Sequence, residues 1–157
     1  MYQKIMVPLD GSKLAECVLP HVEELATCCG TEQVILVSVT ERITGYRVIE
    51  DPTQPLGERL LPEAVGKKEK QAQRYLGKIA KALEAKGIKV LTEVLLGKPA
   101  EEITLYAANE GCDLIIMASH GRSGPSRWAY GSVAEKVFRA NCAPLLMVRA
   151  PGCAGSV

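Results

Sequence analysis

This sequence has few aromatic residues and almost no net charge. One Trp and one Phe occur among 157 residues, while 47% of the residues are hydrophobic, so we expect an aliphatic core. A formal net charge of +1 argues against a broad surface for nucleic acid or for an acidic membrane. No apolar run reaches the ~20 residues that a membrane-spanning helix requires. We therefore expect neither nucleic acid nor a membrane as a partner.

A secretion signal and metal-binding spacings are also missing. The N-terminus passes after three residues into the apolar run that starts at Lys4-Ile5, without the layout of a signal peptide, so we expect a cytoplasmic protein with reduced thiols. The six cysteines form no Cys-x-x-Cys pair, and the histidines are His21 and His120 alone, so no zinc site is predicted. The cysteines are interpreted mainly as small apolar side chains.

The motifs of several common enzyme classes are absent as well. The chain has no Walker-type phosphate loop, and no G-x-G-x-x-G follows its first predicted strand. Asp10 stands without the clustered acids that a phosphoacceptor domain carries, and the two histidines offer no Ser–His–acid set. Because no residue is evident as a general base, we predict no catalytic residues.

What the chain does contain is an alternation of strands and helices. Apolar runs predict strands at residues 4–9, 33–39, 88–95, 113–118 and Leu145–Val148. Helical periodicity predicts a helix after Ser12 that bends at Pro20, and further helices at residues 67–86, 99–110 and Ser132–Ala140. Residues 41–66, rich in Gly and Pro, are predicted to be a long irregular connection.

This order predicts an α/β fold with three layers, α/β/α. The sheet should be five-stranded and parallel, with strand order 3-2-1-4-5 and right-handed crossovers. We expect residues 1–150 to form a single domain and residues 151–157 to form a flexible tail.

The segment after the fourth predicted strand carries the strongest functional signal. It places Gly121 and Gly124 after a buried strand and leads into a helix that starts at Ser132. Glycines allow the backbone to approach a phosphate, and the first N–H groups of a helix lack intrahelical partners. Ligands of such sheets bind beyond the strand carboxyl ends where the strand order reverses, which places Asp10 beside this loop. The residues therefore predict a phosphate-binding site there.

Three residues of this site have more than one interpretation. Ser132 and Glu135 have the spacing of a capping box, so Ser132 either only caps its helix or also belongs to a phosphate site. Asp10 either closes a local turn, or accepts from a ribose hydroxyl or holds a metal ion on the phosphates. His120 is placed to contact phosphate, but no acid–base partner for it is evident.

Five sequence blocks together resemble the universal stress protein family, in its ATP-binding (UspA-like) subgroup with an adenine nucleotide alpha-hydrolase-like fold. The blocks are IMVPLDGS from Ile5, GKPA from Gly97, DLIIMASHGRSG from Asp113, GSVAEKV from Gly131 and PLLMV from Pro144. ATP-binding members carry Gly-x2-Gly-x9-Gly-Ser/Thr, and this chain has Ala118 at the first glycine. An alanine is tolerated there if its φ is negative and its Cβ points aside.

The resemblance implies a homodimeric stress-response regulator that binds ATP, AMP or ADP, with Mg²⁺ or Mn²⁺ accompanying the nucleotide. By resemblance, Asp10 and its neighbours border the ribose and base, Val39 meets adenine through its backbone, and the glycine loop and helix start hold the phosphates. The implied nucleotide-binding residues are Pro8, Leu9, Asp10, Val39, Met117, Ala118, Ser119, His120, Gly121, Arg122, Ser123, Gly124, Gly131, Ser132, Val133 and Ala134.

The resemblance also implies how such a protein acts. Dimers are expected to form through the last strand, Leu145–Val148, because an unpaired apolar edge invites a partner. From the length and composition of the connection at residues 41–66, and not from the resemblance, we expect nucleotide occupancy to change this segment and thereby contacts with unidentified protein partners. The alternatives are a dimeric interaction module that binds no nucleotide, for which Ala118 is the argument, and a slow ATP hydrolase.

Overall fold

The computed structural model of the chain describes residues 2–40, 63–120, 131–140 and 143–149. Four predicted site residues, Gly121, Arg122, Ser123 and Gly124, lie outside these ranges, as do the predicted tail and most of the predicted long connection. The elements are β1 (Lys4–Pro8), the 3₁₀ helix η1 (Ala15–Val18), α1 (Leu19–Cys29), β2 (Gln33–Thr40), α2 (Glu63–Glu84), β3 (Val90–Leu96), α3 (Pro99–Asn109), β4 (Leu114–Ala118), α4 (Ser132–Ala140) and β5 (Leu145–Val148).

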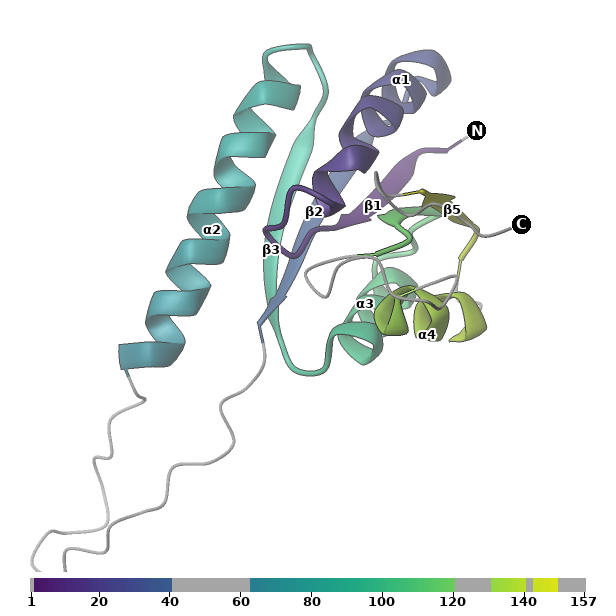
Figure 1. Cartoon of the computed structure of the whole chain (residues 1–157). Coiled ribbons are helices and arrows are strands. Elements are labelled where there is room, and N and C mark those ends of the chain that lie inside the picture. Colours follow the sequence, from purple (N-terminus) through teal and green to yellow (C-terminus); the bar gives the residue numbers. More distant parts are fainter. Residues whose placement is uncertain (1, 41–62, 121–130, 141–142, 150–157) are drawn as a thin grey trace, which may run out of the picture.

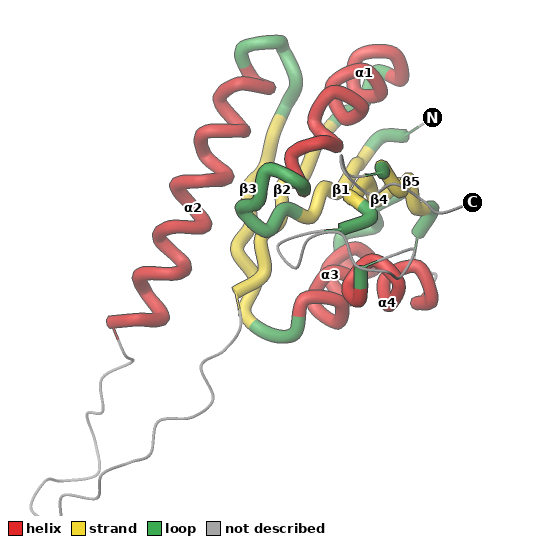
Figure 2. Tube along the Cα trace, in the orientation of Figure 1, coloured by secondary structure: helices red, strands yellow, loops and turns green. Residues whose placement is uncertain are grey.

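The five strands form one parallel sheet with the order β3-β2-β1-β4-β5, which confirms the predicted topology (Figure 2). β1 lies in the middle, where it pairs with β2 over its whole length and with β4 at Ile5 and Met6. The strand order therefore reverses at β1, so the carboxyl ends of β1, β2 and β4 surround the point where ligands of such sheets bind.

Two apolar cores cover the two faces of the sheet. α1 and α2 pack on one face over side chains such as Val7, Leu36 and Ile116, and α3 and α4 pack on the other over Met6 and Met117 (Figure 1). Consecutive residues of a strand point to opposite faces, which explains why continuous apolar runs form β1, β2 and β4. β3 lies at an edge, in keeping with its more exposed pattern.

The predicted bend at Pro20 is wrong. The chain forms the short η1 first, and α1 starts afterwards with Pro20 in its first turn. A proline is tolerated there because the N–H that it lacks would have no intrahelical partner. The helix ends at Gly30 in a left-handed conformation, with φ 61° and ψ 45°, which glycine adopts without strain.

The second helix is longer than its predicted range. α2 begins at Glu63, so the last residues of the predicted connection are helical. The buried side of α2 consists of Leu76, Ala80 and Leu83, which pack on the sheet. Past its last turn, Gly87 adopts a φ of 81°, the conformation expected of a residue that follows a helix.

Candidate functional site

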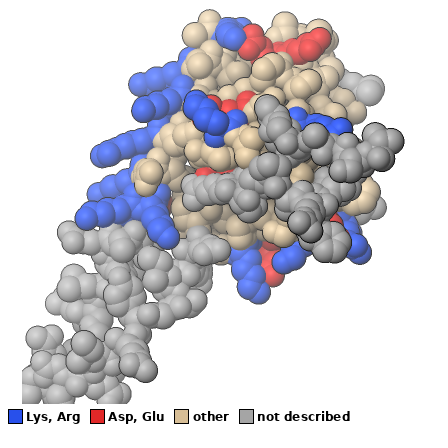
Figure 3. Space-filling view, viewed as in Figure 1, with Lys and Arg blue, Asp and Glu red and all other residues tan. Residues whose placement is uncertain are grey.

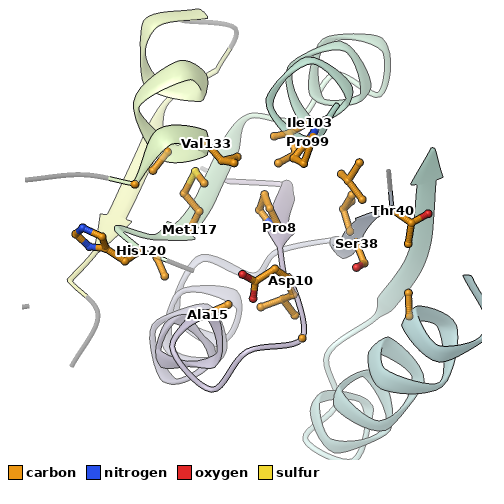
Figure 4. Close-up of a pocket in the computed structure, with 18 of the residues that line it drawn as sticks. Pro8, Asp10, Ala15, Ser38, Thr40, Pro99, Ile103, Met117, His120 and Val133 are labelled. Atoms are coloured by element: carbon orange, nitrogen blue, oxygen red, sulfur yellow. The ribbon is translucent and has the colours of Figure 1, made fainter. Parts of the chain in front are cut away.

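A pocket of about 700 Å³ lies at the carboxyl ends of β1, β2 and β4 (Figure 4). In the close-up, Pro8 and Asp10 lie at its centre, with Ser38 and Thr40 on one side and Met117 and His120 on the other. Its volume is within the range of sites for small molecules, which is about 300–1,000 Å³. The pocket thus occupies the predicted position at the reversal of strand order.

Every predicted site residue that the structure describes lines this pocket. These residues are Pro8, Leu9, Asp10, Val39, Met117, Ala118, Ser119, His120, Gly131, Ser132, Val133 and Ala134. They come from β1, β2, β4 and α4, which lie far apart in the sequence, and the fold brings them to one edge of the sheet.

Asp10 shapes the loop that leaves β1. Its Oδ1 accepts a hydrogen bond from the Ser12 N–H at 2.9 Å, which is the local turn that the sequence offered as one interpretation. The Ser12 hydroxyl in turn accepts from the Ala15 N–H at 3.1 Å and caps the start of η1. This arrangement fixes a carboxylate at the pocket wall, so the turn role and a ligand role are compatible.

The two ends of the predicted glycine loop are joined by the backbone. The Gly131 N–H donates to the Ser119 carbonyl at 2.7 Å, and the Ser119 N–H donates to the Val148 carbonyl at 2.8 Å. A Cβ on Gly131 would lie 3.1 Å from the Ser119 oxygen, a tighter approach than most side chains tolerate. Glycine at position 131 therefore lets the start of α4 lie against the end of β4, beside the pocket.

The prediction that Ser132 caps α4 in a capping box is wrong, because the N-cap lies one residue earlier. The Glu135 N–H donates to the Gly131 carbonyl at 2.9 Å, which makes Gly131 the N-cap and Ser132 the first helical residue. The Glu135 carboxylate pairs with Arg139 at 2.9 Å instead of reaching back to the helix start. Gly131 directly precedes the first N–H groups of α4 and has no side chain that would cover them.

Ser119 and His120 form a buried polar pair at the pocket wall. Each is 4% exposed, and Ser119 Oγ lies 3.1 Å from His120 Nδ1. When the hydroxyl donates to Nδ1, the imidazole carries its proton on Nε2 and becomes a fixed donor. An N–H donor of this kind suits the binding of an anion in a partly buried site.

Ala118 meets the first structural condition for replacing the family's first glycine. It is the last residue of β4, where it pairs with Val148 in extended backbone, so no left-handed conformation is required of it. It is 8% exposed and belongs to the core on the α1 and α2 face, while it also lines the pocket.

Sequence reasoning missed the wall that α2 and α3 contribute. From α2, Lys68, Gln71, Ala72 and Tyr75 line the pocket, and their spacing of three and four residues is that of one helix face. Pro99 and Ile103 do the same from α3. The helical spacing was visible in the sequence, but nothing there indicated that this side of α2 would overlie the carboxyl ends of the strands.

The described lining carries few charged groups. Asp10 is its carboxylate and Lys68 its lysine ammonium, and apolar side chains and backbone make up much of the rest. Within residues 2–40, 63–120, 131–140 and 143–149, no three His, Cys, Asp or Glu side chains gather into a metal site. In the same part of the chain, no helix is long and apolar enough to cross a membrane.

Comparisons with known proteins agree with this architecture. A family model for the universal stress protein family matches residues 1–149. The universal stress protein MJ0577 of Methanocaldococcus jannaschii is 34% identical over 155 residues, which cover 95% of this chain and 96% of that protein. The universal stress protein YxiE of Bacillus subtilis is 30% identical over 95% of this chain and 100% of its own length.

Solved structures show the same fold. The structure of MJ0577, reported as a structure-based assignment of biochemical function, superimposes with a TM-score of 0.81 and 35% identity over 97% of this chain and 99% of that chain. A universal stress protein in complex with cAMP gives a TM-score of 0.67 over 95% of this chain and 98% of that chain. At 18% identity, that second likeness concerns the fold alone.

Proposed function

The chain belongs to the universal stress protein family, and we propose that it is an adenine-nucleotide-binding member that binds ATP at the carboxyl edge of its sheet. The observation that carries the proposal is the convergence of Asp10, the Ser119–Gly131 junction and the start of α4 on one pocket of about 700 Å³. A universal stress protein with this fold has been solved in complex with cAMP, so the fold is able to hold a nucleotide.

The chemistry of the lining suits the parts of a nucleotide. The start of α4 offers helix N–H groups to phosphate oxygens, and His120, with Ser119 donating to its Nδ1, is proposed to add a side-chain donor at the same end. Asp10 is positioned as an acceptor for ribose hydroxyls, and the apolar residues around Val39 suit a purine ring. Gly121, Arg122, Ser123 and Gly124 are proposed to complete the phosphate site.

Mg²⁺ or Mn²⁺ is proposed to bind with the nucleotide. Asp10 is a carboxylate of the lining, and phosphate oxygens would supply the further hard ligands that such ions prefer. We assign no catalytic residue, because the sequence offers no evident general base, so any hydrolysis of ATP is expected to be slow.

Titration calorimetry with ATP, ADP and AMP, with and without Mg²⁺, tests the proposal. We expect ATP to bind and Asp10→Asn to weaken binding, since the amide keeps an oxygen for the Ser12 turn but lacks the charge. The matched control is Asp113→Asn, whose carboxylate accepts from the Gln3 and Lys4 N–H groups at the opposite end of the sheet. Absence of heat with all three nucleotides would favour the family member that works without nucleotide, the alternative that Ala118 raises.

The output of nucleotide binding is proposed to be regulatory. We propose a cytoplasmic homodimer, paired through Leu145–Val148, in which occupancy of the pocket alters contacts with other proteins. Residues 41–62 connect β2 to α2, and both of these elements line the pocket, so an effect of the ligand on this connection is expected. Hydrogen exchange of that segment with and without ATP tests the step, and identical exchange would contradict it.

A further inference from the structure

A row of five cations runs along the outer side of α2. Lys67, Lys70, Arg74, Lys78 and Lys81 follow one another at intervals of three or four residues. At 100° per residue they fall within an arc of about 80° and extend over about 21 Å of the helix. We call these five residues the basic stripe. Figure 3 shows Lys and Arg side chains projecting in a column along the side of the molecule that α2 occupies.

The basic stripe is separate from the pocket and from the core. All five side chains are exposed, and they lie on the side of the helix opposite the buried residues Leu76 and Leu83. The pocket-lining residues of α2, such as Lys68 and Tyr75, lie on its flank. The stripe therefore contributes nothing to packing on the sheet and is not part of the proposed nucleotide site.

The ion pairs between described residues do not use the cations of the stripe. These five ion pairs use other cations, among them Lys13, Lys86 and Arg139. Three acids belong to α2: Glu63 and Glu84 stand at its two ends, and Glu69 is the single acid between Gly66 and Leu83 and lies near the flank turned away from the pocket. A net charge of +1 for the whole chain means that this positive field is local.

We propose that the basic stripe is a docking surface for an acidic helix of another protein. A helix with Glu or Asp at the same intervals presents a row of carboxylates with the same spacing of about 5 Å, so the two rows match along their whole length. Such ladders of charges select partners and set their orientation. A second copy of this chain is a poorer match, because Glu16, Glu23 and Glu101 already pair with its own lysines.

The side chains around the stripe argue against the other anionic surfaces. A membrane surface is bound by helices that insert apolar side chains, whereas the apolar side of α2 is packed on the sheet. Single-stranded nucleic acid is bound by exposed aromatic side chains beside the cations, and Tyr75 of α2 faces the pocket.

A designed peptide tests the proposal on the full chain. The probe is a labelled helical peptide with Glu at positions i, i+3, i+7, i+11 and i+14, and its control has the same composition with the Glu residues distributed around the helix. The variant Lys70→Gln/Arg74→Gln/Lys78→Gln removes the centre of the stripe. Lys89→Gln/Lys98→Gln/Lys136→Gln is its matched control, because both variants lower the formal net charge from +1 to −2, by three positive charges each.

We expect fluorescence anisotropy to show binding of the matched peptide, weakened by salt and reduced about tenfold or more by the stripe variant. The control variant should bind within about twofold of the wild type, since its three lysines lie on β3, α3 and α4 or just before them. Unchanged thermal unfolding of both variants, and an unchanged response to ATP, separate loss of docking from loss of the fold or of the pocket.

Four results would overturn the proposal. They are equal binding of the two peptides, equal loss in the two variants, tighter binding of a DNA duplex or of phosphatidylserine vesicles than of the matched peptide, and self-association of the wild type that the stripe variant abolishes. Because the peptide assay contains no nucleotide, its outcome is independent of whether the pocket binds ATP.

Discussion

Asp10 and Gly131 are held in place by backbone contacts that also shape the pocket. The Asp10 carboxylate accepts the Ser12 N–H, and Gly131 donates to the Ser119 carbonyl. Both residues lie where chain segments leave the sheet, so each helps to close a loop and at the same time faces the site. Substitutions there must therefore be judged by stability and by ligand affinity together.

Replacing Gly131 by Ala places a methyl group 3.1 Å from the Ser119 oxygen, so the end of β4 or the start of α4 must move by a few tenths of an ångström. We expect the free energy of unfolding to fall by about 1 kcal/mol and the Kd for ATP to rise. Urea unfolding and calorimetry measure the two effects. Gly66→Ala is the control for steric cost: nothing lies within 4 Å of its added Cβ, so inside α2 it should not lower the free energy of unfolding and should leave the Kd unchanged. An unchanged Kd would remove this junction from the phosphate site.

The raised pKa of Tyr106, in α3, predicts a loss of stability at high pH. Burial, with help from the charges of Glu93 and Glu110, raises the pKa of Tyr106 from 10.0 to about 12. The native state therefore keeps this proton where the unfolded state loses it. The resulting stabilisation is complete below pH 10 and disappears as the pH rises from 10 to about 12.

The corresponding experiment is thermal unfolding of Tyr106→Phe between pH 9 and pH 12. The variant should lose less stability over this interval than the wild type, because it has no phenol to ionise. Tyr2→Phe serves as the control, since Tyr2 lies before β1, outside α3. Parallel losses in Tyr106→Phe and in the wild type would show that other groups govern the alkaline transition.

At the level of elements, much of the fold could be predicted from the sequence. The buried strands are recognisable in the sequence as apolar runs. Both α4 and β5 have the bounds that were predicted for them. The helix starts were less predictable where two local signals compete. Pro20 fits a bend inside a helix as well as a first turn, and a Ser three residues before a Glu resembles a capping box although Gly131 is the cap.

The candidate site divides in the same way. The walls from β1, β4 and α4 carry local signals, namely a polar residue after an apolar run and glycines before a helix. The wall from α2 was missed because the rotation of a helix over a sheet depends on long-range packing. From the sequence, Lys68 of that wall cannot be told apart from the lysines of the basic stripe, which face away from the sheet.

Glycines in the helices give a prediction at this scale. Gly77 lies inside α2 with open space around an added Cβ, so Gly77→Ala should raise the free energy of unfolding by up to about 1 kcal/mol. Gly30 ends α1 at a φ of 61°, so Gly30→Ala should lower it by about 1 kcal/mol although no atom lies within 4 Å. Chemical unfolding of the two variants compares them. Equal signs would contradict the assigned backbone conformations.

The whole molecule presents two different surfaces on opposite sides. β5 forms one edge of the sheet, whereas α2, with the basic stripe, covers the side of β2 and β3 (Figure 1). A dimer formed through β5 would thus leave the stripe of each copy accessible. Assembly and docking are therefore compatible, and the pocket lies between the two surfaces at the carboxyl edge of the sheet.

Pairing through β5 can be tested with one exposed leucine. Leu146 is 36% exposed and lies on β5, one edge of which pairs with β4. A charge on an edge strand opposes pairing with a second chain. We expect the wild type to sediment at twice the chain mass of 16.9 kDa and Leu146→Lys to sediment as a monomer. Leu105→Lys, at a 58% exposed leucine on α3, should remain dimeric. Sedimentation equilibrium distinguishes these results, and a dimeric Leu146→Lys variant would place the interface elsewhere.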